Sequence, residues 1–352
     1  MLKRKKILIT GATGFIGSHL AERCAIENLA VWGIDNLSRR GNQFNLDYLK
    51  IKYPENFKFQ RLDLIRKDKL ETFFHDNGPF DWIAHEAGQV AVTISLTDPL
   101  HDFHSNTVAT LNLLEIVRKY SPEAKIAFAS TNKVYGKLND LEVREHAKKY
   151  AFVGSFSGVT EQQPLDFQSP YGCSKGSADQ YVCDYARSYG LRTTVFRQSC
   201  IYGTRQFGLE DQGWVAWFLI AAALGKPTTI YGNGKQTRDL LWIDDLCDLY
   251  MKFWESDTFP WGTPINAGGG LSKCISLIEL IDIMGELNIK FKAPDFGDWR
   301  KGDQKIFCSD NSRALKLLNW KPTTPTSIGI EKLWKWILAN KEAINKLLES
   351  QN

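Results

Sequence analysis

The sequence predicts an α/β protein: a doubly wound parallel sheet followed by a smaller C-terminal α/β lobe. Three observations support this fold class: strand-like and helix-like segments alternate along the first part of the chain, a glycine-rich turn joins the first strand to the first helix, and the alternation loosens after Gln198. Strands that alternate with helices usually form a parallel sheet covered by helices on both faces. We therefore expect a first domain over residues 1–198 and a second lobe over residues 199–352, with an approximate boundary and interleaved segments.

Each expected strand is a short apolar run. The first covers residues 7–9, and the segment 14–26 that follows places its apolar side chains at roughly helical spacing. Further strands are expected at 31–34, 57–62, 82–85, 126–129 and 193–196, with helices over 106–119 and 175–189. In the second lobe the expected elements are shorter and lie at 229–231, 239–243 and 306–309.

The composition indicates a cytoplasmic enzyme. With 352 residues, of which 43% are hydrophobic, the chain can bury a large core. No stretch approaches the roughly 20 apolar residues of a membrane span, and the apolar run after the basic start is too short for a signal peptide. The net charge of +4 is mild, and the lysines and arginine at positions 3–6 are more typical of a solvated flank than of a nucleic-acid site. We expect neither a nucleic acid nor a membrane as partner.

The cysteines and histidines predict no metal site. Seven cysteines occur without any Cys-x-x-Cys pair, an odd and scattered set that favours reduced thiols over a disulfide framework or a zinc site. His101 and His104 lie near each other in the sequence but lack a third ligand. We therefore expect free thiols and no bound metal.

A glycine turn, Gly11-x-x-Gly14-x-x-Gly17, lies between the first strand and the first helix. Such a turn lets the backbone approach a diphosphate, which the helix N-terminus then binds through its N–H groups. The spacing departs from Gly-x-Gly-x-x-Gly, and three glycines can also form an ordinary turn. The strand before it, the helix after it and Asp35 at the end of the next strand favour a Rossmann dinucleotide site, with Asp35 accepting from the ribose hydroxyls.

The acidic residue also indicates which cofactor is bound. Asp35 repels a 2′-phosphate, whereas Arg39 and Arg40 attract one, and we favour NAD over NADP because Asp35 lies nearer the strand end. Residues at the turn and after the following strands are assigned to the cofactor by position: Phe15, Ile16, Asn36, Ser38, Arg39, Asp63, Leu64, Ala87, Gly88 and Gln89.

Three residues between these landmarks predict the chemistry. Tyr171 and Lys175 are four residues apart, and so share one face of a helix, while Thr131 follows the strand at 126–129. A phenol has a pKa near ~10, and a neighbouring ammonium and a positive nicotinamide both favour the phenolate, a general base. Lys175 would also bind the cofactor ribose, and Thr131 would hydrogen-bond the reacting oxygen. Each residue alone is more often structural, but together, behind a dinucleotide turn, they favour catalysis.

Several longer segments carry a family resemblance. TGATGFIGSHL, IDNLSRRG, STNKVYG, SPYGCSK and GNGKQTRDLLWIDDL resemble the extended short-chain dehydrogenases/reductases that act as nucleotide-sugar epimerases and dehydratases, and the resemblance covers almost the whole chain. GQVAVTISLTDP, LDFQSPYGCSKGSADQY and RQFGLEDQGWVAWF are similar to the CDP-paratose 2-epimerase (CDP-tyvelose epimerase) subgroup.

The resemblance implies roles for individual residues. Thr131, Tyr171 and Lys175 would be catalytic, with Asn106 in the helix beside them and NAD as cofactor. Arg238 and Arg300 would bind the diphosphate of the substrate, since guanidinium groups suit phosphate oxygens. Thr131, Asn132, Gln89 and Gln206 are expected to contact the sugar, whereas Asp211 and Gln212 either help shape that pocket or belong to an ordinary polar loop, an alternative that also holds for Gln206. The family also implies a homo-oligomer, a dimer or tetramer.

One departure from the family narrows the reaction. The 4,6-dehydratases of this group usually carry Asp-Glu directly after the hydroxyl residue, where this chain has Asn132 and Lys133. An amide and an ammonium cannot replace that acid and base, so dehydration is disfavoured. The expected reaction is inversion of C2 of a CDP-hexose, CDP-paratose to CDP-tyvelose or CDP-glucose to CDP-mannose, through a transient 2-keto sugar that rotates and is reduced again.

Two alternatives remain open. A UDP-sugar 4-epimerase uses the same three catalytic residues, and only the subgroup segments argue against it. A redox-sensing protein that binds NAD without catalysis can keep the glycine turn, but such proteins commonly lack an intact Tyr and Lys pair.

Overall fold

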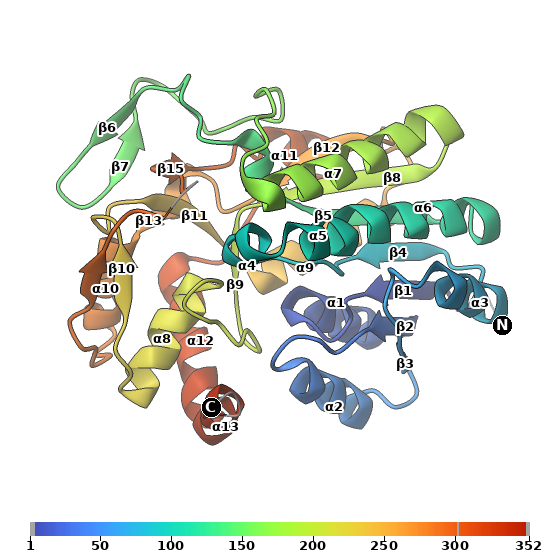
Figure 1. Ribbon diagram of the computed structural model, residues 1–352, viewed down its shortest axis with the longest axis horizontal. Helices are drawn as coiled ribbons and strands as arrows, with labels where there is room; N and C mark the ends of the chain where they lie inside the picture. The colour runs from blue at the N-terminus through green and yellow to red at the C-terminus, as the bar shows by residue number, and fades with distance from the viewer. Residues whose placement is uncertain (1–3, 301–302, 350–352) are drawn as a thin grey trace. The chain divides into compact units, whose positions relative to one another are not determined.

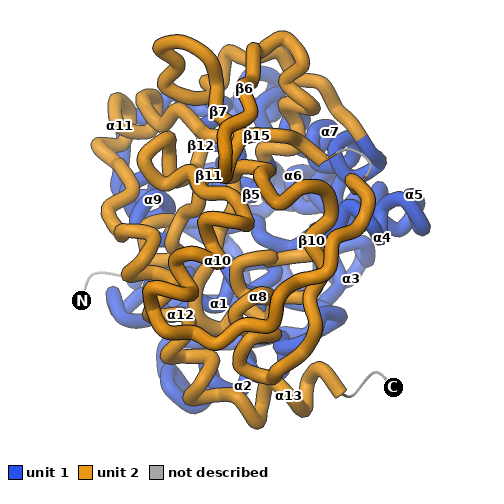
Figure 2. Tube along the Cα trace, turned by 90° about the vertical axis from the view of Figure 1, so that its left-hand side faces the viewer, with its two compact units in different colours: residues 1–131, 169–197, 247–265 blue, residues 132–168, 198–246, 266–352 orange. Residues whose placement is uncertain are grey.

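The computed structural model describes residues 4–300 and 303–349, so that Lys3 of the basic flank lies outside the described residues (Figure 1). The chain forms two compact units, each assembled from three separate segments (Figure 2). Unit 1 contains the residues up to Thr131, Ser169–Arg197 and Cys247–Ile265. Unit 2 contains Asn132–Gln168, Gln198–Leu246 and the residues from Asn266 onward.

Unit 1 is built on a seven-stranded sheet with the order β12-β8-β5-β4-β1-β2-β3, of which only the last residues of β8 and β12 belong to unit 2. The pairs β1–β2, β1–β4, β2–β3 and β4–β5 are all parallel. The strands are β1 (Lys6–Thr10), β2 (Ala30–Asp35), β3 (Phe57–Arg61), β4 (Trp82–His85), β5 (Lys125–Thr131), β8 (Arg192–Gln198) and β12 (Thr263–Ala267). This confirms the predicted fold class. Chain order reverses between β1 and β4, the position where doubly wound sheets bind ligands at the carboxyl ends of their strands.

Helices cover the sheet of unit 1. They are α1 (Phe15–Ile26), α2 (Asn42–Lys52), α3 (Lys67–Asn77), α4 (Val92–Thr97), α5 (Pro99–Phe103), α6 (Ala109–Tyr120), α7 (Ser169–Tyr189) and α9 (Ile243–Glu255). Leu70, Leu113 and Val182 of α3, α6 and α7 share one buried apolar cluster with Ile83 of β4. The neighbouring Trp82 points to the opposite face, because side chains alternate along a strand, and there it stacks on Trp254 of α9.

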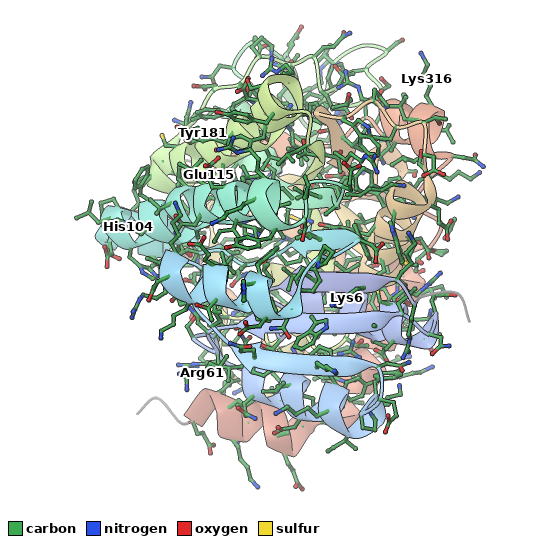
Figure 3. All side chains as sticks on the ribbon, turned by 90° about the vertical axis from the view of Figure 1, so that its right-hand side faces the viewer. Lys6, Arg61, His104, Glu115, Tyr181 and Lys316 are labelled. Atoms are coloured by element: carbon green, nitrogen blue, oxygen red, sulfur yellow. A yellow bond between two sulfur atoms is a disulfide. The ribbon has the colours of Figure 1, made fainter. Side chains whose placement is uncertain are left out.

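The helix predicted over residues 106–119 begins with an irregular turn. α5 runs into a π-helical turn, η1 (His104–Val108), before α6 continues the same path. Single π-helical turns inside longer helices are frequent at functional sites. His101 and His104 are both exposed, and Figure 3 labels His104, the first residue of this turn.

Unit 2 has smaller sheets. In one of them β11 (Thr237–Trp242) pairs with β13 (Cys274–Ser276), β15 (Ile306–Phe307) and β9 (Cys200–Tyr202). β10 (Thr229–Tyr231) pairs with β14 (Asp295–Gly297), and β6 (Val143–Glu145) pairs with β7 (Tyr150–Phe152). The helices of this unit are η2 (Asn132–Tyr135), α8 (Trp214–Leu224), η3 (Leu271–Lys273), α10 (Leu277–Glu286), α11 (Ser312–Leu318), α12 (Thr326–Ala339) and α13 (Lys341–Glu349).

Two cysteines of unit 2 correct the sequence-based expectation. Cys274 of β13 and Cys308, directly after β15, form a disulfide across a Cα–Cα distance of 6.3 Å. The prediction that all seven cysteines are reduced thiols is therefore wrong for this pair. The two residues are 34 positions apart and meet only because both strands pair with β11, which spacing in the sequence does not reveal.

Within the described residues, no helix is long and apolar enough to cross a bilayer.

Candidate active site

The three predicted catalytic residues come together in unit 1. Thr131 is the last residue of β5, while Tyr171 and Lys175 lie on successive turns of α7. Their sequence explains the start of α7, because Pro170 suits the first turn of a helix and the Ser169 hydroxyl accepts a hydrogen bond from the Gly172 N–H at 3.3 Å. The Thr131 side chain hydrogen-bonds the Tyr171 hydroxyl, and all three side chains are buried.

Burial governs the acidity of Tyr171. It raises the pKa of the phenol, and the Asp102 carboxylate adds to this effect, whereas the hydrogen bond from Thr131 and the charge of Arg39 oppose it; the result is a pKa of about 12. The phenol of the protein alone is therefore protonated at neutral pH. A further positive charge beside it is needed before Tyr171 can act as a base.

The pKa of Lys175 is lowered, so that, as for Tyr171, the shift favours the neutral form of the side chain. Burial lowers the pKa of its ammonium to about 8, although Glu86, Asp179 and Asp102 all act to raise it. The ammonium donates to the carbonyl of Ala129 at 2.5 Å and lies 4.2 Å from the ring centre of Phe128. It is thus mainly cationic at neutral pH, and close to its titration point.

The glycine turn has the geometry expected of a dinucleotide cradle. Gly11 has a φ of +66°, and a Cβ there would lie 2.7 Å from the backbone nitrogen of Ala87. A Cβ on Gly17 would collide with the carbonyl oxygen of Gly11. Helix α1 starts with Gly14 as an N-cap that has no capping side chain, and its first turn carries no acidic residue. The helix start without a capping side chain and the lack of Cβ atoms fit the diphosphate of NAD.

Thr13 adds a second sign of a ligand at this turn. Its buried hydroxyl oxygen has no hydrogen-bond partner among the described residues, although buried hydroxyls are normally paired. The Thr13 N–H donates to Asp35 at 3.1 Å. The turn is therefore tied to the acidic residue that was predicted to bind the ribose.

The predicted cofactor residues after β2 and β3 are also neighbours. Asp35 is the last residue of β2, and it accepts hydrogen bonds from the Leu37 N–H at 2.8 Å and from the Asn42 side chain at 3.0 Å. Asn36 donates to Asp63 at 3.0 Å, and its own side-chain oxygen accepts from the Ser38 N–H. Leu64 is buried, whereas Phe15, Ile16 and Arg39 are partly exposed.

A buried polar network lies next to α7. Asp102 accepts hydrogen bonds from the side chains of Gln89 at 2.8 Å, Asn106 at 3.2 Å and Ser174 at 2.5 Å. Asn106 Nδ2 also donates to Ser174, and its oxygen accepts from the Gln89 N–H. Glycine is required at position 88, because a Cβ there would lie only 2.7 Å from Asn106 Oδ1. The network connects the loop after β4, which contains Ala87, Gly88 and Gln89, to helix α7.

The predicted substrate residue Arg238 lies in a charged cluster of unit 2. Arg238 of β11 is buried and donates to Asp303 and to the carbonyl of Gln304, both at 2.6 Å. Lys133 lies 3.7 Å from the same carboxylate. Burial would raise the pKa of Asp303, but Arg238 and Lys133 outweigh it and hold that pKa below its usual range. Asn132, the first residue of η2, is buried next to Lys133 in the sequence.

The other predicted substrate residues of unit 2 lie elsewhere in it. Arg300 stacks over the ring of Tyr231 at 4.0 Å and donates to the carbonyl of Glu210 at 3.1 Å. The buried Gln206 donates to the carbonyl of Ile201 at 3.3 Å. Asp211 and Gln212 are partly exposed in the loop before α8.

The model of the NAD dependent epimerase/dehydratase family matches residues 7–268. The chain belongs to this family. It is 40% identical to the CDP-paratose 2-epimerase of Salmonella typhi over 94% of this chain and 98% of that protein. It is 31% identical to a putative UDP-glucose 4-epimerase of Methanocaldococcus jannaschii over 95% and 99% of the two chains. Among solved structures, the UDP-glucuronic acid 4-epimerase of Bacillus cereus, in complex with UDP-glucuronic acid and NAD, is similar, with a TM-score of 0.81, 29% identity and coverage of 94% and 98%.

Family membership confirms the predicted family, the enzyme class and NAD as the cofactor. Sequence reasoning missed Asp102 and Ser174, although Asp102 precedes Asn106 by one helical turn and Ser174 stands between Tyr171 and Lys175. Helical spacing could have placed each of them beside a predicted residue. It could not have paired them, because they come from helices 72 residues apart.

Proposed function

We propose that this protein is an NAD-dependent epimerase that inverts C2 of a CDP-hexose, such as CDP-paratose to CDP-tyvelose or CDP-glucose to CDP-mannose. The observation that carries the proposal is the buried group of Thr131, Tyr171 and Lys175 in the unit that holds the glycine turn. The 40% identity to a CDP-paratose 2-epimerase supports the sugar nucleotide and the carbon. Unit 1 binds NAD, and residues of unit 2 bind the nucleotide sugar.

The chain's own residues handle the proton. NAD, held by the glycine turn and Asp35, would supply a hydride acceptor and donor for C2 of the sugar. Tyr171, as the phenolate, takes the proton from the C2 hydroxyl and later returns it to the ketone oxygen. Lys175 favours the phenolate by its positive charge, and Thr131 hydrogen-bonds the reacting oxygen. Because the same hydride leaves and returns, no net oxidation occurs.

Binding roles follow the same division. Gly11, Gly14 and Gly17 hold the diphosphate of NAD, and Asp35 holds its adenosine ribose. Asn36, Ser38, Asp63 and Leu64 line the adenosine end, whereas Ala87, Gly88, Gln89 and Asn106 line the nicotinamide end.

We assign the binding of the nucleotide sugar to residues from each unit. Arg238 and Arg300 hold its diphosphate, with Asn132 and Gln206 on the sugar, while Thr131 and Gln89 of unit 1 contact the reacting end. We further propose that the protein is a cytoplasmic homo-oligomer.

Side-by-side turnover of CDP-paratose, CDP-glucose and UDP-glucose in deuterated water tests this function. We expect turnover of a CDP-hexose, with inversion at C2 and no solvent deuterium at that carbon, since the hydride never exchanges. Activity confined to UDP-glucose would instead establish a 4-epimerase. Stoichiometric deuterium at the inverted carbon would replace hydride transfer by deprotonation next to a carbonyl.

A further inference from the structure

Asp102 is a fully buried carboxylate whose hydrogen-bonding side chains are all neutral. It lies in α5 with 0% of its surface exposed, and its donors are an amide of Gln89, an amide of Asn106 and the hydroxyl of Ser174. Burying a carboxylate costs solvation free energy, which hydrogen bonds from neutral donors offset only in part.

The three donors come from three different elements. Gln89 lies in the loop after β4, Asn106 in the π-helical turn η1 and Ser174 in α7. Ser174 stands on α7 between Tyr171 and Lys175, and its hydroxyl is also 3.2 Å from the carbonyl oxygen of Tyr171. The carboxylate therefore anchors the turn of α7 that carries both catalytic side chains.

The charged groups that act on Tyr171 and Lys175 differ in whether an oppositely charged side chain is bound to them. Arg39 and Asp102 act on Tyr171, and Glu86, Asp179 and Asp102 act on Lys175. Asp179 is held by two hydrogen bonds of 3.0 Å from the Arg197 guanidinium, so much of its charge is cancelled. His85 is buried and its pKa is lowered to about 3 by desolvation and by Lys175, so the ring is neutral.

Resting on the proposed function, we propose that Asp102 is a positioning residue for hydride transfer: it fixes the α7 turn that carries Tyr171 and Lys175, and it places a negative charge beside both. Its charge keeps Lys175 cationic and holds Tyr171 in the phenol form until the cofactor and substrate are bound. Nothing in this role requires Asp102 to touch the substrate.

The pH dependence of turnover distinguishes this role from a structural one. The active form carries Tyr171 as the phenolate and Lys175 as the ammonium, so the two residues set the two limbs of the profile together, as a coupled pair. Asp102 raises the pKa of both groups, and Asp102→Asn therefore moves both limbs toward lower pH. We expect kcat to fall about tenfold as well, because the turn is less firmly held.

Two further variants complete the design. Asp98→Asn makes the same charge change four residues earlier, at an exposed N-cap of α5 that Asn also fills, and it should leave the profile unchanged. Ser174→Ala removes a donor and concentrates the Asp102 charge, so it should lower kcat and move both limbs toward higher pH, opposite to Asp102→Asn. Because it deletes only one hydroxyl, it carries the test if Asp102→Asn does not fold.

A titration without substrate separates this proposal from the proposed function. The ultraviolet phenolate band of Tyr171, taken as the difference between the protein and its Tyr171→Phe variant, should appear at lower pH in the Asp102→Asn background and at higher pH in Ser174→Ala. If the wild type turns over no nucleotide sugar, the proposed function fails while this titration still decides the role of Asp102. Unshifted limbs and an unshifted phenolate band in a folded variant would overturn the role.

Discussion

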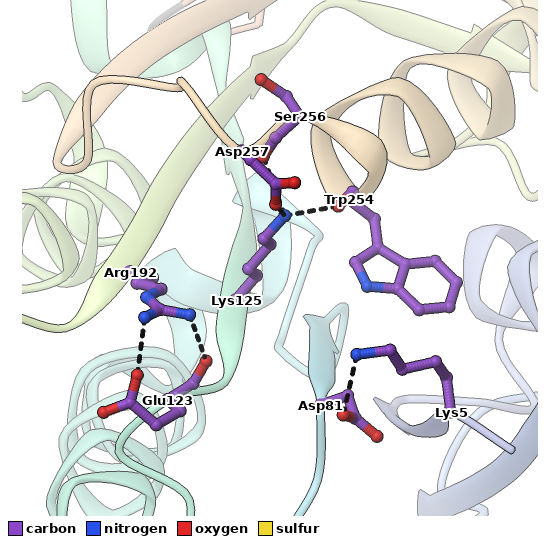
Figure 4. Close-up of polar contacts among 8 residues, drawn as sticks. All are labelled: Lys5, Asp81, Glu123, Lys125, Arg192, Trp254, Ser256 and Asp257. Carbon is purple, nitrogen blue, oxygen red and sulfur yellow. Dashed lines mark hydrogen bonds and ion pairs between the residues drawn. The ribbon is translucent and has the colours of Figure 1, made fainter. Parts of the chain in front are cut away.

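The two ends of the strands in the sheet of unit 1 differ in how far their charged side chains are exposed to solvent. At the amino ends of the strands, Figure 4 shows ion pairs at the surface: Lys125 at the start of β5 with Asp257, and Arg192 at the start of β8 with Glu123. Asp257 and Glu123 are 93% and 80% exposed. At the carboxyl ends, Tyr171 and Lys175 are 7% and 5% exposed, and the nearby Asp102 has neutral donors.

This difference in exposure means that charged groups at one end of the strands can affect only stability, while those at the other end can affect the reaction. In water, an ion pair contributes little, because solvent screens it and the side chains lose entropy. In the protein interior, loss of solvation is the main cause that raises the pKa of Tyr171 and lowers that of Lys175, and nearby charges such as Asp102 modify both values. We therefore expect substitutions at the amino ends to leave kcat unchanged, whereas loss of charge at Lys175 or Asp102 should lower it.

Tyr171→Phe should have the largest effect. Removing the phenol oxygen that, as the phenolate, is proposed to accept the sugar proton should lower kcat by at least about 10³-fold while bound NAD is retained. The measurements are turnover of the CDP-hexose and the nucleotide content of the purified variant. Tyr181→Phe, a change at an exposed position on the same helix, is the matched control and should be silent. A Tyr171→Phe enzyme of normal rate would remove this residue from the mechanism and break the comparison.

Lys175→Met should separate activity from stability. The lysine has its pKa lowered from 10.5 to about 8 in the folded protein, so the unfolded chain binds its proton more tightly between those two values. Its burial therefore destabilises the fold fully below about pH 8, and the penalty fades as the pH rises toward 10.5. We expect the variant to lose about 10²-fold in kcat.

Thermal unfolding supplies the second readout of that variant. At pH 7 its Tm should exceed that of the wild type, and the gap should close at higher pH. A Tm that is lower at every pH would show that the hydrogen bond of Lys175 to Ala129 outweighs the cost of its buried charge.

The sequence predicted the residues of the candidate site, at the carboxyl ends of the strands, better than it predicted the residues that hold them in place. The strand ends, the glycine turn and the Tyr171–Lys175 pair depend on neighbours within a few residues, so local patterns predict them. Asp102, the Cys274–Cys308 disulfide and strand β12 depend on segments that meet only after folding. Arg238 and Arg300 were predicted through family resemblance, and their assigned roles stay predictions.

Lys125→Met tests the amino ends of the strands. The lysine donates to the carbonyls of Trp254 and Ser256 at 2.7 and 2.8 Å, and its side chain is only 11% exposed (Figure 4). Its loss leaves two carbonyls without their donor, so the free energy of unfolding should fall by about 1–3 kcal/mol. Denaturant unfolding measures this, and kcat below the unfolding transition should equal that of the wild type. A lowered kcat would mean that the two ends of the sheet are coupled.

Arg192→Gln should have the smallest effect. Arg192 pairs with Glu123 at 2.6 Å, but both side chains lie largely in solvent, where screening limits the contribution of the pair. The free energy of unfolding should fall by at most about 1 kcal/mol, and that loss should shrink in high salt. The matched variant is Glu123→Gln, because it removes the other half of the same pair. A loss as large as that of Lys125→Met, or one that salt leaves unchanged, would mean that exposure does not set the contribution of an ion pair at this end of the sheet.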